Sequence, residues 1–415
     1  MRTLIKNIDS LVTVKSNNLP YRKGKAMQDI SEIKDGAVLF SDVIEFFGTS
    51  EEVEKYIAIN NIEINEYIKA KDKTILPGFV DSHTHIIFAG NRSSEFARRL
   101  RGATYQEIAN EGGGIITTME ATRKASVEEL FLNGKKIALN AIQHGTTAFE
   151  IKSGYGLSLE AEIKLLKAIK LLKEDIDVHI AATFLGAHDF PPEYKDKKDK
   201  YVDIICNEMI PKVAEEKLAD FCDVFIDEGY FTLRQSEQIL RTALDYGLKL
   251  KVHCDELANI GATELCASLG AISVDHLLFI SKEGIDALSK SHTIATLLPG
   301  TAYFIRMPYA PARQIIDSDV PVSLATDCNP GSCFTENMQI ILSLSVINMK
   351  MTAEEAVVAS TLNAASAIAK SDEMGSIDIG KKANLVMADC SSYTDIFYHF
   401  GVNHIEKVWI NGITR

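Results

Sequence analysis

From Ile75 onward, short apolar runs alternate along the chain with longer stretches in which apolar residues recur at helical spacing. Helical stretches such as Leu159–Lys173 and Leu233–Tyr246 lie between most of the runs, which is typical of βα units around a parallel sheet. Eight runs have the length of strands: Gly78–His85, Thr146–Lys152, Val178–Gly186, Phe221–Asp227, Lys249–Asp255, Ala271–His276, Thr293–Leu298 and Pro321–Asp327. Eight strands over roughly 250 residues predict an α/β fold of the (β/α)8 TIM-barrel kind.

Both ends of the chain have a different pattern, with short β segments between polar turns. Gly36–Phe40 and Ile62–Asn65 are examples near the N-terminus, and Val408–Ile410 enters a tight Asn411-Gly412 turn near the C-terminus. We therefore expect a small β-sandwich domain built from both ends. The predicted divisions are 1–74 and 371–415 for the small domain and 75–370 for the barrel.

Composition narrows the class of protein. The formal net charge of −13 argues against nucleic acid as a partner, and we interpret the mixed-charge run 195–200 as a solvated loop. No stretch approaches the roughly 20 apolar residues of a membrane helix, and the N-terminal residues do not resemble a signal peptide. The seven cysteines are scattered and never spaced as CxxC, which fits reduced thiols. We expect a cytoplasmic enzyme with no membrane partner.

Polar side chains gather where the predicted strands end. His83 and His85 share one side of the first strand because the side-chain period of a strand is two. His253, His276 and Asp327 end the fifth, sixth and eighth strands. A core histidine or a helix N-cap would explain any one of them, but together they indicate a metal site at the carboxyl end of the barrel. The same alternation should turn the neighbouring Cys254 and Cys328 away from the site.

This pattern resembles the amidohydrolase superfamily, as does the segment Leu76–Asp81 before the first histidine. The resemblance implies that His83, His85, His253 and Asp327 hold the metal while His276 acts on the substrate. It also implies one ion, zinc or iron, because the fourth strand lacks the lysine of two-metal members. Asp327 would move the proton of a metal-activated water and His276 would polarise the carbonyl, a scheme that suits an amide, an amidine or an aminopurine.

Several segments resemble the imidazolonepropionase family more closely than deaminases, namely residues 86–96, 104–115, 151–157, 183–188 and 327–332. The resemblance implies a homodimer that hydrolyses 4-imidazolone-5-propanoate. Its substrate contacts would be Arg92, Tyr155, His188 and Glu256, its contacts to the opened product Asn329, Gly331 and Ser332, and Glu256 would be a further candidate for proton transfer. An arginine fork suits the carboxylate of this substrate.

Other interpretations stay open at this point. Arg92 taken alone is more often a surface arginine, and Tyr155 between two glycines could be a turn residue. Gly112–Gly114 does not fit a phosphate loop, because no strand precedes it and no lysine follows; we expect a loop near the pocket mouth. An aminohydrolase of a cytosine- or guanine-like base would share the metal site. A non-catalytic binding scaffold of the same fold would typically lack some of the ligands.

Overall fold

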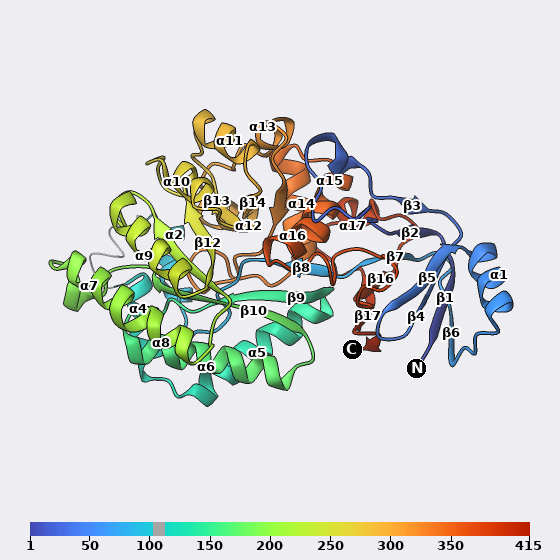
Figure 1. The fold of residues 1–415 in the computed structure, drawn as a ribbon, viewed down its shortest axis with the longest axis horizontal. Coiled ribbons are helices and arrows are strands. Elements are labelled where there is room, and N and C mark those ends of the chain that lie inside the picture. The colour runs from blue at the N-terminus through green and yellow to red at the C-terminus, as the bar shows by residue number, and fades with distance from the viewer. Residues whose placement is uncertain (103–112) are drawn as a thin grey trace.

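The computed structural model describes residues 1–102 and 113–415, and eight parallel strands form its central sheet (Figure 1). They follow one another in chain order and match the eight predicted runs. Their bounds are β8 (Phe79–Asp81), β9 (Thr146–Lys152), β10 (His179–Ala187), β11 (Phe221–Ile226), β12 (Lys249–Cys254), β13 (Ser273–His276), β14 (Ile294–Leu297) and β15 (Val322–Leu324). The predicted (β/α)8 fold is confirmed.

The first and last strands meet just beyond their carboxyl ends and close the barrel. A parallel bridge joins Thr84 to Cys328. The backbone N–H of Asp327 donates to the carbonyl of His83 at 3.0 Å, and that of His85 donates to the carbonyl of Cys328 at 2.9 Å. The closure of the barrel thereby brings His83 and His85, which follow the first strand, next to Asp327, which follows the last.

Helices cover the outside of the barrel. Side chains of β9 alternate between the two faces of the strand. Phe149 and Ile151 join the apolar core shared with helix α6 (Leu159–Asp175), whereas Glu150 and Lys152 point into the barrel. The helices are α2 (Ser93–Leu100), α4 (Ile115–Lys124), α5 (Val127–Gln143), α6 (Leu159–Asp175), α7 (Lys198–Ile204), α8 (Ile210–Glu215), α9 (Leu233–Asp245), α10 (Ala262–Ser268), α11 (Lys282–Ser289), α12 (Pro299–Ile305), α13 (Ala312–Asp317), α14 (Met338–Met349), α15 (Ala353–Ser360), α16 (Leu362–Ala367) and α17 (Asp395–Tyr398). Single turns or short irregular helices occupy Gly24–Gln28, Pro192–Tyr194 and Ile205–Met209.

The two chain ends build a separate pair of sheets beside the barrel (Figure 1). One sheet has the order β5-β4-β1-β6 and the other the order β18-β17-β16-β7-β2-β3. The bounds are β1 (Thr3–Ile8), β2 (Ser10–Val12), β3 (Glu32–Ile33), β4 (Gly36–Phe40), β5 (Ile44–Thr49), β6 (Glu66–Lys69), β7 (Thr74–Pro77), β16 (Leu385–Ala388), β17 (Ile405–Ile410) and β18 (Ile413–Thr414), with helix α1 (Ser50–Asn60) after β5.

One apolar core joins these two sheets. It includes Phe40 of β4, Ile75 of β7 and Trp409 of β17, and the rings of Phe40 and Trp409 meet edge to face. Asn411 and Gly412 both have left-handed backbone angles in the turn between β17 and β18, as the predicted hairpin requires. Strand β7 pairs with β16 and β2 of the small domain and ends at Pro77. The divisions after residues 74 and 370 stay predictions.

Within the described part of the chain, no helix combines the length and the apolar character that crossing a membrane requires.

Candidate active site at the carboxyl end of the barrel

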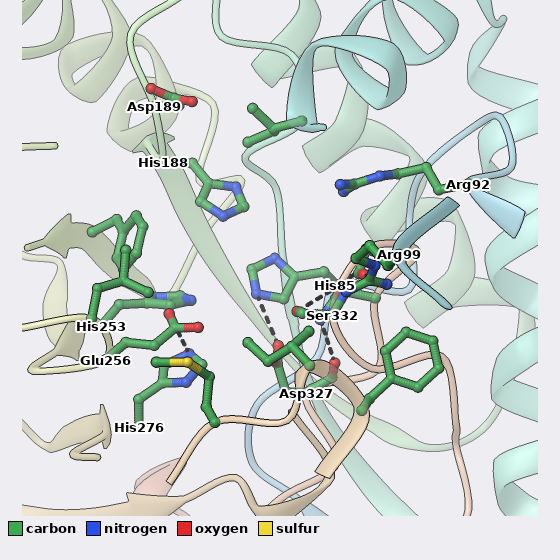
Figure 2. Close-up of a pocket in the computed structure, with 18 of the residues that line it drawn as sticks. His85, Arg92, Arg99, His188, Asp189, His253, Glu256, His276, Asp327 and Ser332 are labelled. Carbon is green, nitrogen blue, oxygen red and sulfur yellow. Dashed lines mark hydrogen bonds and ion pairs between the residues drawn. The ribbon is translucent and has the colours of Figure 1, made fainter. Parts of the chain in front are cut away.

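A cavity of about 430 Å³ opens at the carboxyl end of the strands, a size that suits a small-molecule ligand. Figure 2 shows labelled histidines, carboxylates and arginines around it. Every site residue predicted from the sequence except His83 lines this cavity: His85, Arg92, Tyr155, His188, His253, Glu256, His276, Asp327, Asn329, Gly331 and Ser332. His83 is fully buried just beneath them.

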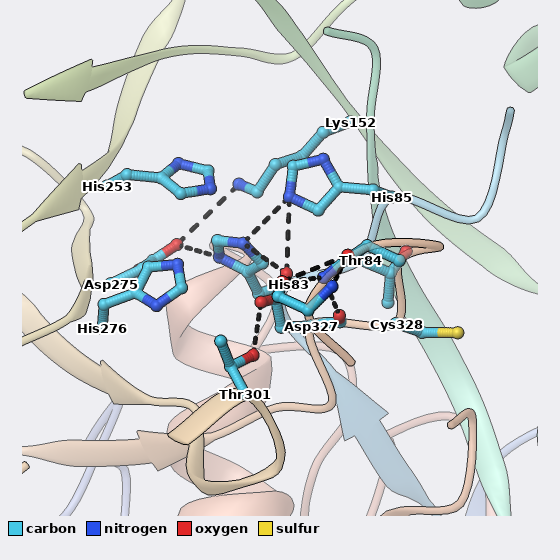
Figure 3. A network of polar contacts seen from close by, with 12 residues as sticks. His83, Thr84, His85, Lys152, His253, Asp275, His276, Thr301, Asp327 and Cys328 are labelled. Atoms are coloured by element: carbon cyan, nitrogen blue, oxygen red, sulfur yellow. Dashed lines mark hydrogen bonds and ion pairs between the residues drawn. The ribbon is translucent and has the colours of Figure 1, made fainter. Parts of the chain in front are cut away.

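The predicted ligand atoms converge at the base of the cavity (Figure 3). The Nε2 atoms of His83 and His85 lie 3.3 Å apart, and each lies 3.5 Å from Oδ1 of Asp327. One ligand atom each from His83, His85 and His253 falls within 4.8 Å of the others, and the same holds for His83, His276 and Asp327. The structure thus brings all four predicted ligands together and places His276 beside them.

Carboxylates lie behind two of the imidazoles, those of His83 and His253. Nδ1 of His83 donates to Oδ2 of Asp275 at 2.6 Å, which leaves the lone pair of Nε2 facing Asp327. Nδ1 of His253 lies 2.8 Å from Oδ2 of Asp223, although the angle falls outside hydrogen-bond geometry. Two acceptor atoms, Nε2 of His83 and Oδ1 of Asp327, therefore face one another without a proton on His83 between them.

The electrostatics of the cluster fit a cation. Burial lowers the pKa of His83, His85 and His253 well below the ordinary value, so these imidazoles are neutral and can each offer a lone pair. Burial raises the pKa of Asp327 to about 7, because the ionised carboxylate is poorly solvated there. A positive charge beside the carboxylate would stabilise its ionised form and lower this pKa. Within the described residues, Nδ1 of His85 is buried without a hydrogen-bond partner. Neutral imidazoles, a carboxylate and a convergent geometry are the donor set of a zinc or iron site.

His276 reaches the cluster through an unusual backbone. Its φ of +83° is rare for a residue with a Cβ, and it breaks the alternation of β13 so that Asp275 and His276 both face the barrel interior. Nε2 of His276 lies 3.5 Å from Oε2 of Glu256. Burial lowers the pKa of His276 to about 3 and raises that of Glu256 well above its ordinary range. A neutral imidazole and a protonatable carboxyl group thus stand side by side next to the predicted ligand cluster.

Arg92 reaches the cavity from the N-terminus of helix α2, on the side away from Glu256 (Figure 2). Its Nε donates to Oε2 of Glu95 at 2.8 Å, and Oε1 of the same carboxylate accepts from the backbone N–H of Gly114 at 3.0 Å. Glu95 therefore holds both Arg92 and the start of helix α4. A second arginine, Arg99, donates to the carbonyl of Gly331 at 2.9 Å and lies over the rings of Phe96 and Phe304.

The loop after β9 positions Tyr155 and His188. The buried carboxylate of Glu162 accepts from the backbone N–H groups of Gly154, Gly156 and Leu157 at 2.7 to 2.9 Å. Nδ1 of His188 lies 3.0 Å from the carbonyl of Gly154 and donates to it, so Nε2 is an acceptor. Burial lowers the pKa of His188 to about 4, which keeps the ring neutral.

Hydrogen bonds hold the turn after Asp327. Oδ1 of Asn329 accepts from the N–H groups of Gly331 and Ser332 at 2.8 Å, and Arg99 donates to the carbonyl of Gly331. The side chain of Asn329 shapes the turn because an asparagine can mimic a backbone acceptor two residues on.

Several residues of the site were not predicted. Asp223 and Asp275 orient histidines, Oγ1 of Thr301 donates to Oδ2 of Asp327 at 2.5 Å, and Arg99 and Phe304 line the cavity wall. The sequence did offer a signal for the two aspartates, because each is a charged residue at an inward position of a buried strand. As predicted, Cys254 turns away, with its sulfur 3.7 Å from that of Cys266 on helix α10. Residues 104–112 of the predicted glycine-rich segment lie outside the described residues.

Comparison with known proteins agrees with this geometry. Residues 74–414 match the amidohydrolase family, and the chain belongs to that family of metal-dependent hydrolases. Imidazolonepropionase from Alkaliphilus oremlandii (strain OhILAs) is 44% identical over 410 residues, which is 98% of this chain and 96% of that protein. Imidazolonepropionase from Geobacillus sp. (strain WCH70) is 47% identical over 415 residues, 99% of this chain and 97% of that one. Within the amidohydrolases, the chain is a member of the imidazolonepropionase family.

Solved structures support the fold. A zinc-bound adenosine deaminase from Xanthomonas campestris superposes with a TM-score of 0.73 at 16% identity, covering 99% of this chain and 92% of that one. A triazine hydrolase variant gives a TM-score of 0.76 at 13% identity, covering 100% and 94%. At these identities the likeness concerns the barrel and its small β domain. The deaminase alternative and the scaffold alternative receive less support than the imidazolonepropionase prediction, because whole-chain relatives carry that name and the predicted ligands are all in place.

Proposed function

We propose that this protein is an imidazolonepropionase. Water adds across the ring amide C–N bond of 4-imidazolone-5-propanoate, the bond breaks, and N-formimidoyl-L-glutamate is the product. One observation carries the proposal: a single cavity holds the histidine–aspartate cluster at its base and the guanidinium of Arg92 on its wall. The first suits hydrolysis of an amide and the second suits a substrate with a carboxylate.

His83, His85, His253 and Asp327 would hold one metal ion, zinc or iron. When bound, the ion would supply Lewis-acid charge and lower the pKa of a water toward neutrality. The residues themselves prepare this site. Asp275 holds His83 with its Nε2 lone pair toward Asp327, and Thr301 holds one oxygen of Asp327 so that the other faces the histidines.

Proton transfer falls to Asp327 and its neighbours. Asp327 would accept the proton of the attacking water and deliver it to the leaving ring nitrogen. His276 would polarise the carbonyl under attack, and Glu256, 3.5 Å from His276, is a second group able to carry a proton.

Substrate recognition would use residues on several sides of the cavity. Arg92 would pair with the propionate carboxylate, with Tyr155 as a further donor nearby. His188 presents an acceptor nitrogen, which suits a ring N–H, and Glu256 would bind another polar edge of the ring. The turn of Asn329, Gly331 and Ser332 would contact the opened product.

Mass spectrometry of the product tests the proposal. The metal-loaded protein is incubated with 4-imidazolone-5-propanoate freshly made by hydration of urocanate. Ring opening adds one water to the substrate mass and releases no ammonia, whereas a deaminase would release ammonia. We expect the mass of N-formimidoyl-L-glutamate with no ammonia formed. Unchanged substrate, or ammonia from a cytosine- or guanine-like base in parallel reactions, would refute the assignment.

We also propose a homodimer in the cytoplasm. The family resemblance supports the dimer, and seven unpaired cysteines support a reducing compartment. Light scattering after gel filtration measures the mass directly, and a monomer mass of 45.8 kDa at micromolar concentration would rule out the dimer.

A further inference from the structure

The interior of this barrel carries charge where a barrel of this kind usually packs branched apolar side chains. Lys152 of β9, Asp223 of β11 and Asp275 of β13 have no exposed surface. They come from the second, fourth and sixth strands, and alternate strands of such a barrel contribute the side chains of one interior layer. This charged layer lies directly beneath the histidine–aspartate cluster, because both aspartates contact histidines of that cluster.

Lys152 is the cation of the layer. Its Nζ donates to Oε1 of Glu150 at 2.7 Å and forms an ion pair with Oδ2 of Asp223 at 2.9 Å. It also lies 3.8 Å from Oδ2 of Asp275. Burial lowers the pKa of Lys152, but the surrounding carboxylates outweigh that effect and the pKa ends above its ordinary value. The ammonium group is therefore present as a charge between the two aspartates.

Each aspartate oxygen near Lys152 is also the oxygen that contacts a histidine. Oδ2 of Asp275 accepts from His83, and Oδ2 of Asp223 lies against Nδ1 of His253. Figure 3 shows Lys152 reaching toward Asp275, which in turn contacts His83. Removal of the ammonium would thus leave the two carboxylates without the cation that they share. They would then repel each other inside a buried layer, although Asp275 would keep its hydrogen bond from Ser273 and Asp223 its bond from the backbone N–H of His253.

We propose that Lys152 is a positioning residue for the metal site: its ammonium bridges the carboxylates of Asp223 and Asp275 and so fixes the imidazoles of His253 and His83 together. The inference rests on the ligand set of the proposed function. Lys152 itself supplies no ligand atom to the metal site. The role is specific to Lys152, because its charge meets the orienting carboxylates of two ligands that come from different strands.

Lys251 offers a matched control within the same barrel. It is also fully buried, and its Nζ donates to Oγ of Ser273 at 2.6 Å and to the carbonyl of Ala367 at 3.3 Å. It lies 3.7 Å from Oδ2 of Asp275, with no ion pair to Asp223 among the described residues. Replacing either lysine by methionine removes one buried ammonium group and leaves an unbranched side chain in its place. Only the Lys152 substitution removes the bridge between both carboxylates.

The experiment compares Lys152→Met with Lys251→Met in the full-length protein. Zinc affinity is measured by competition with a chromophoric chelator, and ligand geometry by the visible absorption bands of the cobalt-substituted protein. We expect Lys152→Met to weaken zinc binding on the order of ten- to a hundredfold, the usual effect of losing an outer partner of a metal ligand, and to change the cobalt bands. Lys251→Met should weaken zinc binding less than about threefold and keep the cobalt spectrum of the parent protein.

Equal losses of zinc affinity in the two variants, or an unchanged cobalt spectrum in Lys152→Met, would overturn the proposal. If Lys152→Met does not fold, the same comparison is made with Lys152→Gln and Lys251→Gln, which keep a hydrogen-bond donor and remove the charge. Neither readout uses the imidazolone substrate. A protein that binds zinc as predicted but leaves imidazolone propionate intact would refute the proposed function and leave the role of Lys152 standing.

Discussion

The guanidinium of Arg92 lies against the backbone of Gly331, so closely that a Cβ on Gly331 would stand 2.1 Å from Nη1 of the arginine. The two residues come from opposite ends of the barrel sequence, one after β8 and the other after β15. Glu95 holds Nε of the same arginine. Arg92 can therefore take its place in the cavity only because residue 331 has no side chain.

Gly331→Ala should displace Arg92 while leaving the barrel folded. Because Arg92 is proposed to bind the substrate carboxylate, kcat/KM should fall on the order of ten- to a hundredfold, mainly through KM. The control is the same substitution in an Arg92→Ala background, where the clash no longer exists. There Gly331→Ala should cost less than about threefold, and steady-state kinetics on the four proteins gives the comparison. If the losses in kcat/KM of the two single variants simply add in the double variant, Gly331→Ala does not act through Arg92.

Arg92→Ala tests the identity of the substrate. A charge-assisted pair contributes roughly 1.5 to 3 kcal/mol, so kcat/KM should fall between about ten- and two-hundredfold. Arg92→Lys should recover only part of the loss, since an ammonium keeps the charge and loses the fork. An imidazolone analogue without the carboxylate should be a poor substrate of the parent protein and lose almost nothing further in Arg92→Ala. Equal losses on both substrates would mean that Arg92 has a structural role.

Thr301→Val should disturb Asp327 without removing it. The substitution keeps the shape of the side chain and deletes the hydroxyl that donates to Oδ2 of Asp327. We expect a loss on the order of ten- to a hundredfold in zinc affinity or in kcat, and Thr301→Ser should behave like the parent protein. Metal analysis alongside kinetics separates the two effects. A fully active, fully loaded Thr301→Val protein would show that the contact does not orient the carboxylate.

His276→Ala distinguishes two roles that the geometry allows. One of its ring nitrogens lies within 4.8 Å of candidate ligand atoms on His83 and Asp327, and its Nε2 lies 3.5 Å from Oε2 of Glu256. If His276 polarises the substrate carbonyl, the His276→Ala protein should keep its full metal content. Its kcat should fall on the order of a hundredfold or more. Metal content and kcat are measured on the same preparation. A rate that falls in proportion to metal occupancy would make His276 a ligand.

Much of the fold was predictable because its signals are local. Apolar runs of strand length and the helical patterns between them gave eight strands, and the polar residues at their ends gave the cluster at the base of the cavity. His83 and His85 could be paired from the sequence because both belong to one strand. The Asn411-Gly412 hairpin was also predictable, since its turn chemistry lies within two residues.

The remaining parts of the site depend on contacts between distant segments. Asp223 meets His253 through the register of β11 against β12, and no single strand reveals that register. The left-handed backbone of His276 places two consecutive residues on one side of a strand, against the simple alternation on which the prediction rested. The contact between Arg92 and Gly331 requires the barrel to close.

The dependence of turnover on bound metal tests the central claim most directly. The protein is stripped of metal with a chelator, and the initial rate of 4-imidazolone-5-propanoate loss is measured as zinc or iron(II) is added back in known equivalents per chain. A single-ion hydrolase predicts negligible turnover in the stripped protein, a linear rise, and a break at about one equivalent. Full turnover by the stripped protein would contradict the account, and so would a break at about two equivalents.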